Sequence, residues 1–229
     1  MIFDPIFFLF LIPPILLMLF AQWRVKNTFG KFSQVLNQRG LSGAEAARKI
    51  LDENGLYDVP VEQVDGELTD HYDPRARALR LSNPVYGGRS VAALGIAAHE
   101  AGHALQHSEG YAPLQIRSLL VPAATFGSNL GWIMILAGVF IQFTALAWLG
   151  VLFFAAGTLF ALVTLPVEFN ASSRAMAMLT TNGMVVTQEE QSQNQQVLNA
   201  AALTYIAGFL AALMQLIYWI LLVAGVSRD

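Results

Sequence analysis

Four long apolar runs alternate with polar segments along the chain. Each run is close to or longer than the ~20 residues that a helix needs to cross a bilayer. The second and third runs contain no charged residue and are separated only by Gln142 and Phe143, which predicts a tight helical hairpin. The pattern predicts four transmembrane helices, at residues 2–23, 118–141, 144–166 and 201–224.

The polar segment after the first run combines a helical pattern with strand patterns. The capping box at 42–45, Ser-Gly-Ala-Glu, predicts a helix that ends near Glu53. Residues 59–64 and 76–82 are typical of short strands, and their proline and arginines suit an exposed sheet edge. An edge strand of this β-ribbon could bind a substrate backbone. Residues 70–74 between the strands predict an Asx-type turn, with a second metal site as the alternative.

Residues 90–107 contain the main candidate chemistry. They are rich in Ala and Gly and free of proline, which predicts a helix. His99 and His103 are four residues apart and share one helix face, so both imidazoles can bind one zinc ion. Glu100 has the position of a general base that acts on a water at the metal. The alternative is that both histidines are packed, hydrogen-bonded helix residues.

A third metal ligand must come from elsewhere in the chain. The sequence has no cysteine, and the extended pattern HExxHxxGxxH fails because position 106 is Gln in place of Gly and position 109 is Glu in place of His. Glu168 is the only acidic residue between positions 109 and 189, and it begins a predicted helix. Two histidines and one glutamate would leave a coordination position open, which is typical of catalytic rather than structural zinc.

Further side chains are candidates for supporting roles. Ser172, one turn after Glu168, or Asn170 could orient a ligand. His107 could be a fourth ligand, although a supporting or surface role is favoured because it lies two turns from His99. Peptide hydrolysis also needs a cationic or hydroxyl group for the oxyanion. The sequence does not choose among three candidates for it, Arg174, Tyr205 and His71.

Composition and charge agree with a membrane protein and suggest its orientation. Hydrophobic residues make up 55% of the chain and charged residues 13%, against about 25% charged in a soluble domain. A net charge of −3 gives no indication of a nucleic-acid partner. In a four-span topology, all of the 13 Lys and Arg residues except Arg228 fall on one side, together with the candidate metal site. The positive-inside rule makes that side cytoplasmic.

Three stretches of the chain form a specific combination. They are Gly-Glu-Leu-Thr-Asp-His-Tyr-Asp-Pro-Arg at 66–75, Ala-Ala-His-Glu-Ala-Gly-His-Ala-Leu-Gln at 97–106 and Pro-Val-Glu-Phe-Asn-Ala-Ser at 166–172. Together they resemble the YugP-type neutral zinc metallopeptidases of bacterial membranes. The resemblance covers nearly the whole chain, and this family is similar to HtpX-type and CAAX-prenyl-protease enzymes. Those have an aspartate four residues after the glutamate ligand, where this chain has Ser172. The resemblance implies one Zn²⁺ per chain, Glu100 as the catalyst, and as ligands His99, His103 and Glu168.

We therefore expect a mainly α membrane protein with about four transmembrane helices and a cytoplasmic zincin-like (gluzincin) α+β domain that contains a short β-ribbon. The expected segments are a first transmembrane helix (1–23), the zincin-like domain (24–115), a transmembrane hairpin (116–166), a cytoplasmic segment with the third ligand (167–200), and a fourth transmembrane helix with its tail (201–229).

The expected function is zinc-dependent cleavage of membrane or membrane-proximal proteins at the cytoplasmic face of the bacterial inner membrane. Its expected partners are a protein or peptide substrate and the lipid bilayer, without nucleic acid. One alternative is an adaptor with a structural zinc, which would join a membrane-protein complex through residues 188–199. Another is a protease with its metal at mid-bilayer depth, which is disfavoured because Arg89 and Glu109 flank the histidine helix.

Overall fold

The computed structural model describes residues 5–226, which divide into two compact units. The first unit contains the chain up to Gln22, then Ala112–Pro166, then the chain from Leu203 onward. The second unit contains Trp23–Tyr111 and Val167–Ala202. Residues 1–4 and 227–229, which include the start of the first predicted segment and Arg228, lie outside the described residues.

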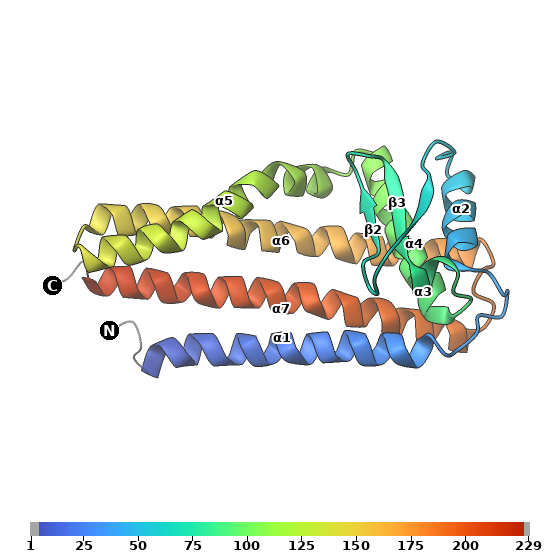
Figure 1. Ribbon diagram of the computed structural model, residues 1–229, viewed down its shortest axis with the longest axis horizontal. Coiled ribbons are helices and arrows are strands. Elements are labelled where there is room, and N and C mark those ends of the chain that lie inside the picture. The colour runs from blue at the N-terminus through green and yellow to red at the C-terminus, as the bar shows by residue number, and fades with distance from the viewer. Residues whose placement is uncertain (1–4, 227–229) are drawn as a thin grey trace. The chain divides into compact units, whose positions relative to one another are not determined.

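Within the described residues, four long helices are candidates to span a membrane, which agrees with the predicted number (Figure 1). Each contains a stretch that is long and apolar enough to cross a bilayer. These helices are α1 (Pro5–Phe32), α5 (Ala112–Phe140), α6 (Thr144–Thr181) and α7 (Gln188–Val226). Their ends extend past the predicted limits at 23, 166 and 200, so the division into five segments stays a prediction.

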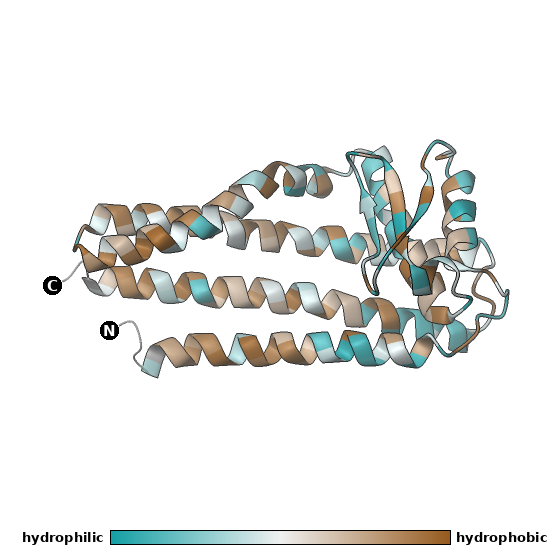
Figure 2. Cartoon of the chain, viewed as in Figure 1, coloured by the Kyte–Doolittle hydropathy of each residue, from teal (hydrophilic) through white to brown (hydrophobic). Residues whose placement is uncertain are grey.

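Close helix packing characterises the first unit, whose helical segments are mostly brown, hence apolar, in Figure 2. A Cβ added to Gly131 of α5 would lie 2.8 Å from the carbonyl oxygen of Gly150 in α6, so these helices approach backbone to backbone. The connection between them includes Gln142 with φ +56°, a conformation that reverses the chain. Ile135, which precedes this turn on α5, belongs to an apolar cluster that also contains Tyr218 and Trp219 of α7.

A three-stranded sheet in the second unit corrects the predicted β-ribbon. Its order is β1 (Val61–Val64), β3 (Ala78–Ser82), β2 (His71–Asp73), with β1 parallel and β2 antiparallel to β3. The prediction that 76–82 forms an exposed edge was wrong, because β3 is central and mostly buried. The exposed-edge expectation failed because Arg80 forms ion pairs with Glu62 and Asp73 on the neighbouring strands.

The predicted turn at 70–74 is partly strand and partly turn. Residues 71–73 form β2, which was missed because three residues are too few for a strand pattern. The Asx-type hydrogen bonds are present, since Asp73 Oδ1 accepts from the backbone N–H groups of Arg75 (2.9 Å) and Ala76 (3.1 Å). Asp70 instead accepts from the backbone N–H of Ser82 at 2.8 Å and joins this loop to the end of β3.

Short helices surround the sheet and complete the core of the second unit. Helix α2 (Gly43–Glu53) begins with the predicted capping box, in which Ser42 and Glu45 exchange hydrogen bonds. Helix α3 (Asn83–Tyr86) leads into α4 (Val91–Ser108), which packs against α2, β2 and β3. The buried side chains include Ile50, Leu79 and Leu94, so α4 lies in the apolar core and not on its surface.

Candidate metal centre

The α4 helix places two imidazoles beside each other. It begins after Ser90, whose side chain accepts a hydrogen bond from the backbone N–H of Ala93 at 3.1 Å. His99 and His103 are one turn apart, and their ring centroids are 4.8 Å apart with the planes nearly perpendicular. His99 is 8% exposed, so one face of the pair is covered by the protein. The spacing in the sequence therefore produces the expected pair of converging rings.

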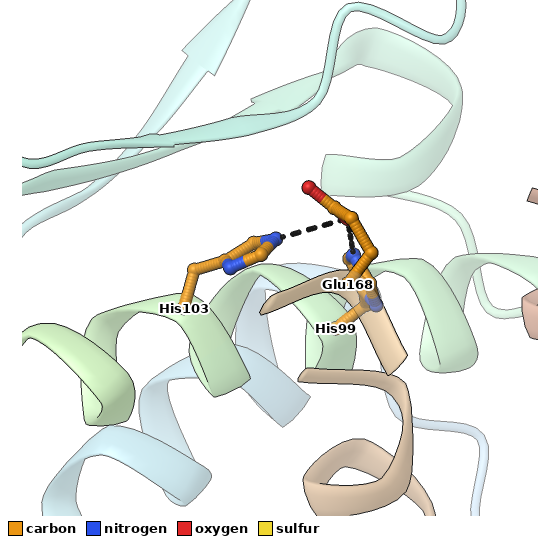
Figure 3. A group of neighbouring side chains, drawn as sticks. All are labelled: His99, His103 and Glu168. Carbon is orange, nitrogen blue, oxygen red and sulfur yellow. Dashed lines mark hydrogen bonds and ion pairs between the residues drawn. The ribbon is translucent and has the colours of Figure 1, made fainter. Parts of the chain in front are cut away.

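A carboxylate from α6 meets these imidazoles (Figure 3). Glu168 is 2% exposed, and its Oε2 lies 3.3 Å from Nε2 of His99 and 3.5 Å from Nε2 of His103. The three possible ligand atoms all lie within 4.8 Å of one another. Within residues 5–226, this is the only cluster of at least three His, Asp or Glu side chains close enough to hold a metal ion, so Asp70–Pro74 provides no second one.

The distances from the Glu168 carboxylate to the two imidazoles fit zinc. Ligands at ~2.0–2.1 Å from a tetrahedral zinc ion are separated from one another by about 3.3–3.4 Å. The distances from Glu168 to the two histidines, 3.3 and 3.5 Å, match that separation. Two neutral imidazoles and one carboxylate are ligands that zinc prefers, and three protein ligands leave the open position of a catalytic site. These residues could therefore hold zinc without a large rearrangement.

A glycine allows α4 and α6 to approach closely enough for this arrangement. A Cβ added to Gly102 would lie 2.8 Å from the carbonyl oxygen of Ala171 and 3.3 Å from its Cα. Both atoms belong to the backbone of α6, which cannot move aside as a flexible side chain could. Gly102 lies next to His103, and Ala171 is three residues after Glu168, so this contact sets the separation of the proposed ligands.

Each imidazole has a polar partner on its Nδ1 atom. Ser172 Oγ lies 3.1 Å from Nδ1 of His99, and Gln106 Oε1 lies 3.0 Å from Nδ1 of His103. Hydrogen bonds of this kind fix ring orientation and leave the other ring nitrogen for a metal. This contact with His99 therefore agrees with the prediction that Ser172 orients a metal ligand. Gln106 was missed, because glutamine is common on helices and its role depends on contacts across 60 residues of sequence.

Glu100 contacts the edge of the sheet. It is 9% exposed, and its Oε2 accepts a hydrogen bond from the backbone N–H of Tyr72 in β2 at 3.0 Å. The hydroxyl of Tyr72 lies 2.8 Å from Nδ1 of His107, one turn past His103. Tyr72 thus joins β2 to α4 at two points and fixes the Glu100 carboxylate. Sequence reasoning missed this tyrosine because nothing local identifies a backbone donor.

The other candidate residues have different surroundings. Arg174 forms an ion pair with Glu109 (2.7 Å), which occupies its guanidinium group. His71 is exposed, and its Nδ1 lies 2.8 Å from the carbonyl oxygen of Thr69. His107 is outside the cluster of three ligand atoms. Tyr205 belongs to the first unit, and its role stays a prediction.

Negative charge dominates the electrostatics of the cluster. Burial alone would lower the pKa of His103, but the hydrogen bond with Glu168 and the charges of Glu100 and Glu168 outweigh burial and raise it. Two carboxylates therefore attract positive charge at this point. A divalent cation would satisfy the same field, which agrees with the ligand geometry.

Comparison with known proteins agrees with the geometry. The model of a family described as "Putative neutral zinc metallopeptidase" matches residues 7–224. The chain belongs to this family. It is also 49% identical over 202 residues to "Putative membrane protease YugP" of Bacillus subtilis (strain 168), an alignment that covers 88% of this chain and 89% of the relative. No solved structure matches the chain. At family level, the protein is a membrane-associated zinc metallopeptidase.

Proposed function

We propose that the protein is a membrane-embedded zinc endopeptidase of the gluzincin type. His99, His103 and Glu168 would be the zinc ligands, and Glu100 the general base. The observation that supports this most strongly is the convergence of two imidazoles on a buried carboxylate at the spacing of zinc ligands. Glu100 directly follows the first histidine, His99, on the same helix.

Bound zinc would supply Lewis acidity at the scissile carbonyl and make a water molecule more acidic. Glu100 takes the proton of the attacking water and delivers it to the leaving amine, so one carboxylate acts first as base and then as acid. The hydrogen bond from Tyr72 N–H to Oε2 holds this carboxylate in one orientation. Since β2 is an edge strand beside Glu100, its backbone is suited to align an extended peptide.

The substrates we propose are membrane or membrane-proximal proteins on the cytoplasmic side of the inner membrane. Four helices are apolar enough to span a bilayer, and the three proposed ligands all belong to the second unit. The basic residues of that unit, among them Arg24, Lys26 and Lys31, favour the cytoplasmic side by the positive-inside rule. We also propose the division into five segments given by the sequence, and we propose that the protein has no nucleic-acid partner.

Substitution of Glu100→Gln in the purified, zinc-loaded protein tests the assignment. The variant should keep close to one zinc per chain and lose cleavage of a fluorogenic protein substrate, because an amide cannot take the water proton. Glu53→Gln is the matched control, since Glu53 is an exposed carboxylate at the end of α2. Cleavage at the wild-type rate by the Glu100 variant would refute Glu100 as the general base, whereas a wild-type protein that binds zinc and cleaves nothing would favour an adaptor with a structural zinc.

A further inference from the structure

A fully buried glutamine connects the proposed metal centre to a chain of hydrogen bonds. Gln106 lies on α4, two residues before the helix ends, and is 0% exposed. Its Oε1 faces Nδ1 of His103 at 3.0 Å. Its Nε2 donates to the carbonyl oxygen of Val167 (2.8 Å) and to Oδ1 of Asn170 (2.9 Å), both on α6. The amide therefore uses both of its N–H groups on α6 and its oxygen on the histidine.

Two groups set the direction of these hydrogen bonds. The carbonyl oxygen of Val167 can only accept, so the Gln106 atom that faces it must be Nε2. Arg174 imposes the same direction through Asn170. A guanidinium group has only donors, so the atom of Asn170 that lies 2.8 Å from Nε of Arg174 must be its oxygen. The same oxygen faces Gln106, which must present its NH₂ group there. Arg174 is itself fixed by Glu109, through contacts of 2.9 Å (Nη1 to Oε1) and 2.7 Å (Nη2 to Oε2).

The remaining atom of the Gln106 amide is its oxygen, which has no proton to give. His103 must therefore carry a proton on Nδ1 and donate it to Gln106, so in the neutral ring Nε2 is the nitrogen without a proton. Nε2 is the atom that faces Glu168 at 3.5 Å. An imidazole whose Nε2 carries the proton would have to break this hydrogen bond and could not offer Nε2 to a metal.

We propose that Gln106 is a positioning residue that, together with Asn170 and Arg174, fixes the tautomer of His103 with Nε2 open to zinc. This inference rests on the proposed function, because it takes His103 as a zinc ligand. It goes beyond that function in that an acceptor-only backbone carbonyl of Val167 and the donor-only guanidinium of Arg174, acting through Asn170, both fix the Gln106 amide and thereby determine which nitrogen of His103 is available. Neither amide touches the zinc ligand atoms themselves.

Two substitutions at one position separate tautomer control from simple packing. In Asn170→Asp, the carboxylate still accepts from both Gln106 and Arg174, so the direction of the chain is kept. In Asn170→Leu, one of the two acceptors that hold the Gln106 NH₂ group is lost, and only the carbonyl oxygen of Val167 still opposes rotation of the amide. Gln106→Leu removes the partner of His103 directly. Circular dichroism in detergent monitors the helical fold of all three.

The first readout uses the zinc-free protein. Two-dimensional ¹⁵N NMR of histidine-labelled protein distinguishes ring nitrogens that carry a proton from those that do not, and the chain has only four histidines to assign. The signal of His103 is assigned by its loss in His103→Gln. At a pH high enough for the His103 ring to be neutral, we expect the proton on Nδ1 in wild type and in Asn170→Asp, a partial shift toward Nε2 in Asn170→Leu and a larger shift in Gln106→Leu.

The second readout is zinc affinity, measured by competition with a chromogenic chelator. Loss of a group that orients a ligand typically weakens binding about 10- to 100-fold, which we expect for the two leucine variants but not for Asn170→Asp. An unchanged His103 tautomer in both leucine variants overturns the inference, even if their zinc affinity falls. Failure of the wild type to bind zinc would refute the proposed function, whereas the NMR comparison would still decide the tautomer inference.

Discussion

Substitution of Gly102→Ala perturbs the contact that sets the separation of α4 and α6. The new Cβ would lie 2.8 Å from the carbonyl oxygen of Ala171, whereas ordinary van der Waals contact begins at 3.4 Å. The helices must therefore separate by about 0.6 Å, because the opposing atoms are backbone. His99 and His103 move with α4 and Glu168 with α6, so their distances of 3.3 and 3.5 Å would rise to about 4 Å.

That change is large for a metal site but modest for the fold. Zinc–ligand distances stay within about 0.2 Å of their ideal values, so we expect zinc affinity to fall about 10- to 100-fold. Overpacking costs about 1–3 kcal/mol, but alanine gains up to about 1 kcal/mol of helix propensity over glycine. The free energy of unfolding should therefore fall by no more than about 2 kcal/mol.

The assay is zinc competition against a chromogenic chelator, with thermal unfolding in detergent as the measure of stability. Gly30→Ala is the matched control, because no atom lies within 4 Å of a Cβ added at that exposed position of α1. It should keep wild-type zinc affinity and gain about 0.5–1 kcal/mol of stability. Wild-type zinc affinity in Gly102→Ala would show that the contact with Ala171 does not control the ligand separation.

Three further predictions concern separate features of the chain. Ser172→Ala removes the 3.1 Å contact with Nδ1 of His99, so zinc affinity should fall about 10-fold in the same competition assay, and an unchanged value would contradict the role of Ser172. Burial raises the pKa of Asp70 above its ordinary 3.8, although Ser82 donates two hydrogen bonds to the carboxylate. The folded state therefore holds the proton more tightly than the unfolded chain does, and the free energy of unfolding falls as pH rises through the raised pKa. Asp70→Asn removes this loss, so its melting temperature relative to wild type should increase from about pH 4 to pH 7; a constant difference would refute the sign. The chain has no cysteine, so Tyr57→Cys, at a 74% exposed position of the second unit, should react with a membrane-impermeant maleimide in inverted vesicles but not in intact cells. Labelling of intact cells would reverse the proposed orientation.

The parts of the fold that depend on local patterns could be predicted. The four apolar helices of the described residues follow from run length, because an uncharged apolar run of ~20 residues is typical of a transmembrane helix. The helix after Ser42 follows from a capping box whose two hydrogen bonds are local. The i, i+4 geometry of a helix likewise brings His99 and His103 together without any tertiary information.

The parts that depend on distant contacts could not be predicted. Strand β2 has only three residues, and it forms because β3 offers a partner and Glu100 accepts the N–H of Tyr72. The arginine of β3 suggested solvent exposure, but acidic residues on both neighbouring strands pair with it. Gln106 gave no signal, since its three hydrogen-bond partners include two that lie more than 60 residues further along the chain.

The central claim is that two imidazoles and one carboxylate, from two helices, bind a single zinc ion. X-ray absorption at the zinc edge of the purified protein tests it most directly. The account predicts two imidazole nitrogens at ~2.0–2.1 Å and carboxylate and water oxygens near 2.0–2.2 Å, with the carboxylate lost in Glu168→Ala. A spectrum with fewer than two imidazoles, or one that Glu168→Ala leaves unchanged, would contradict the account.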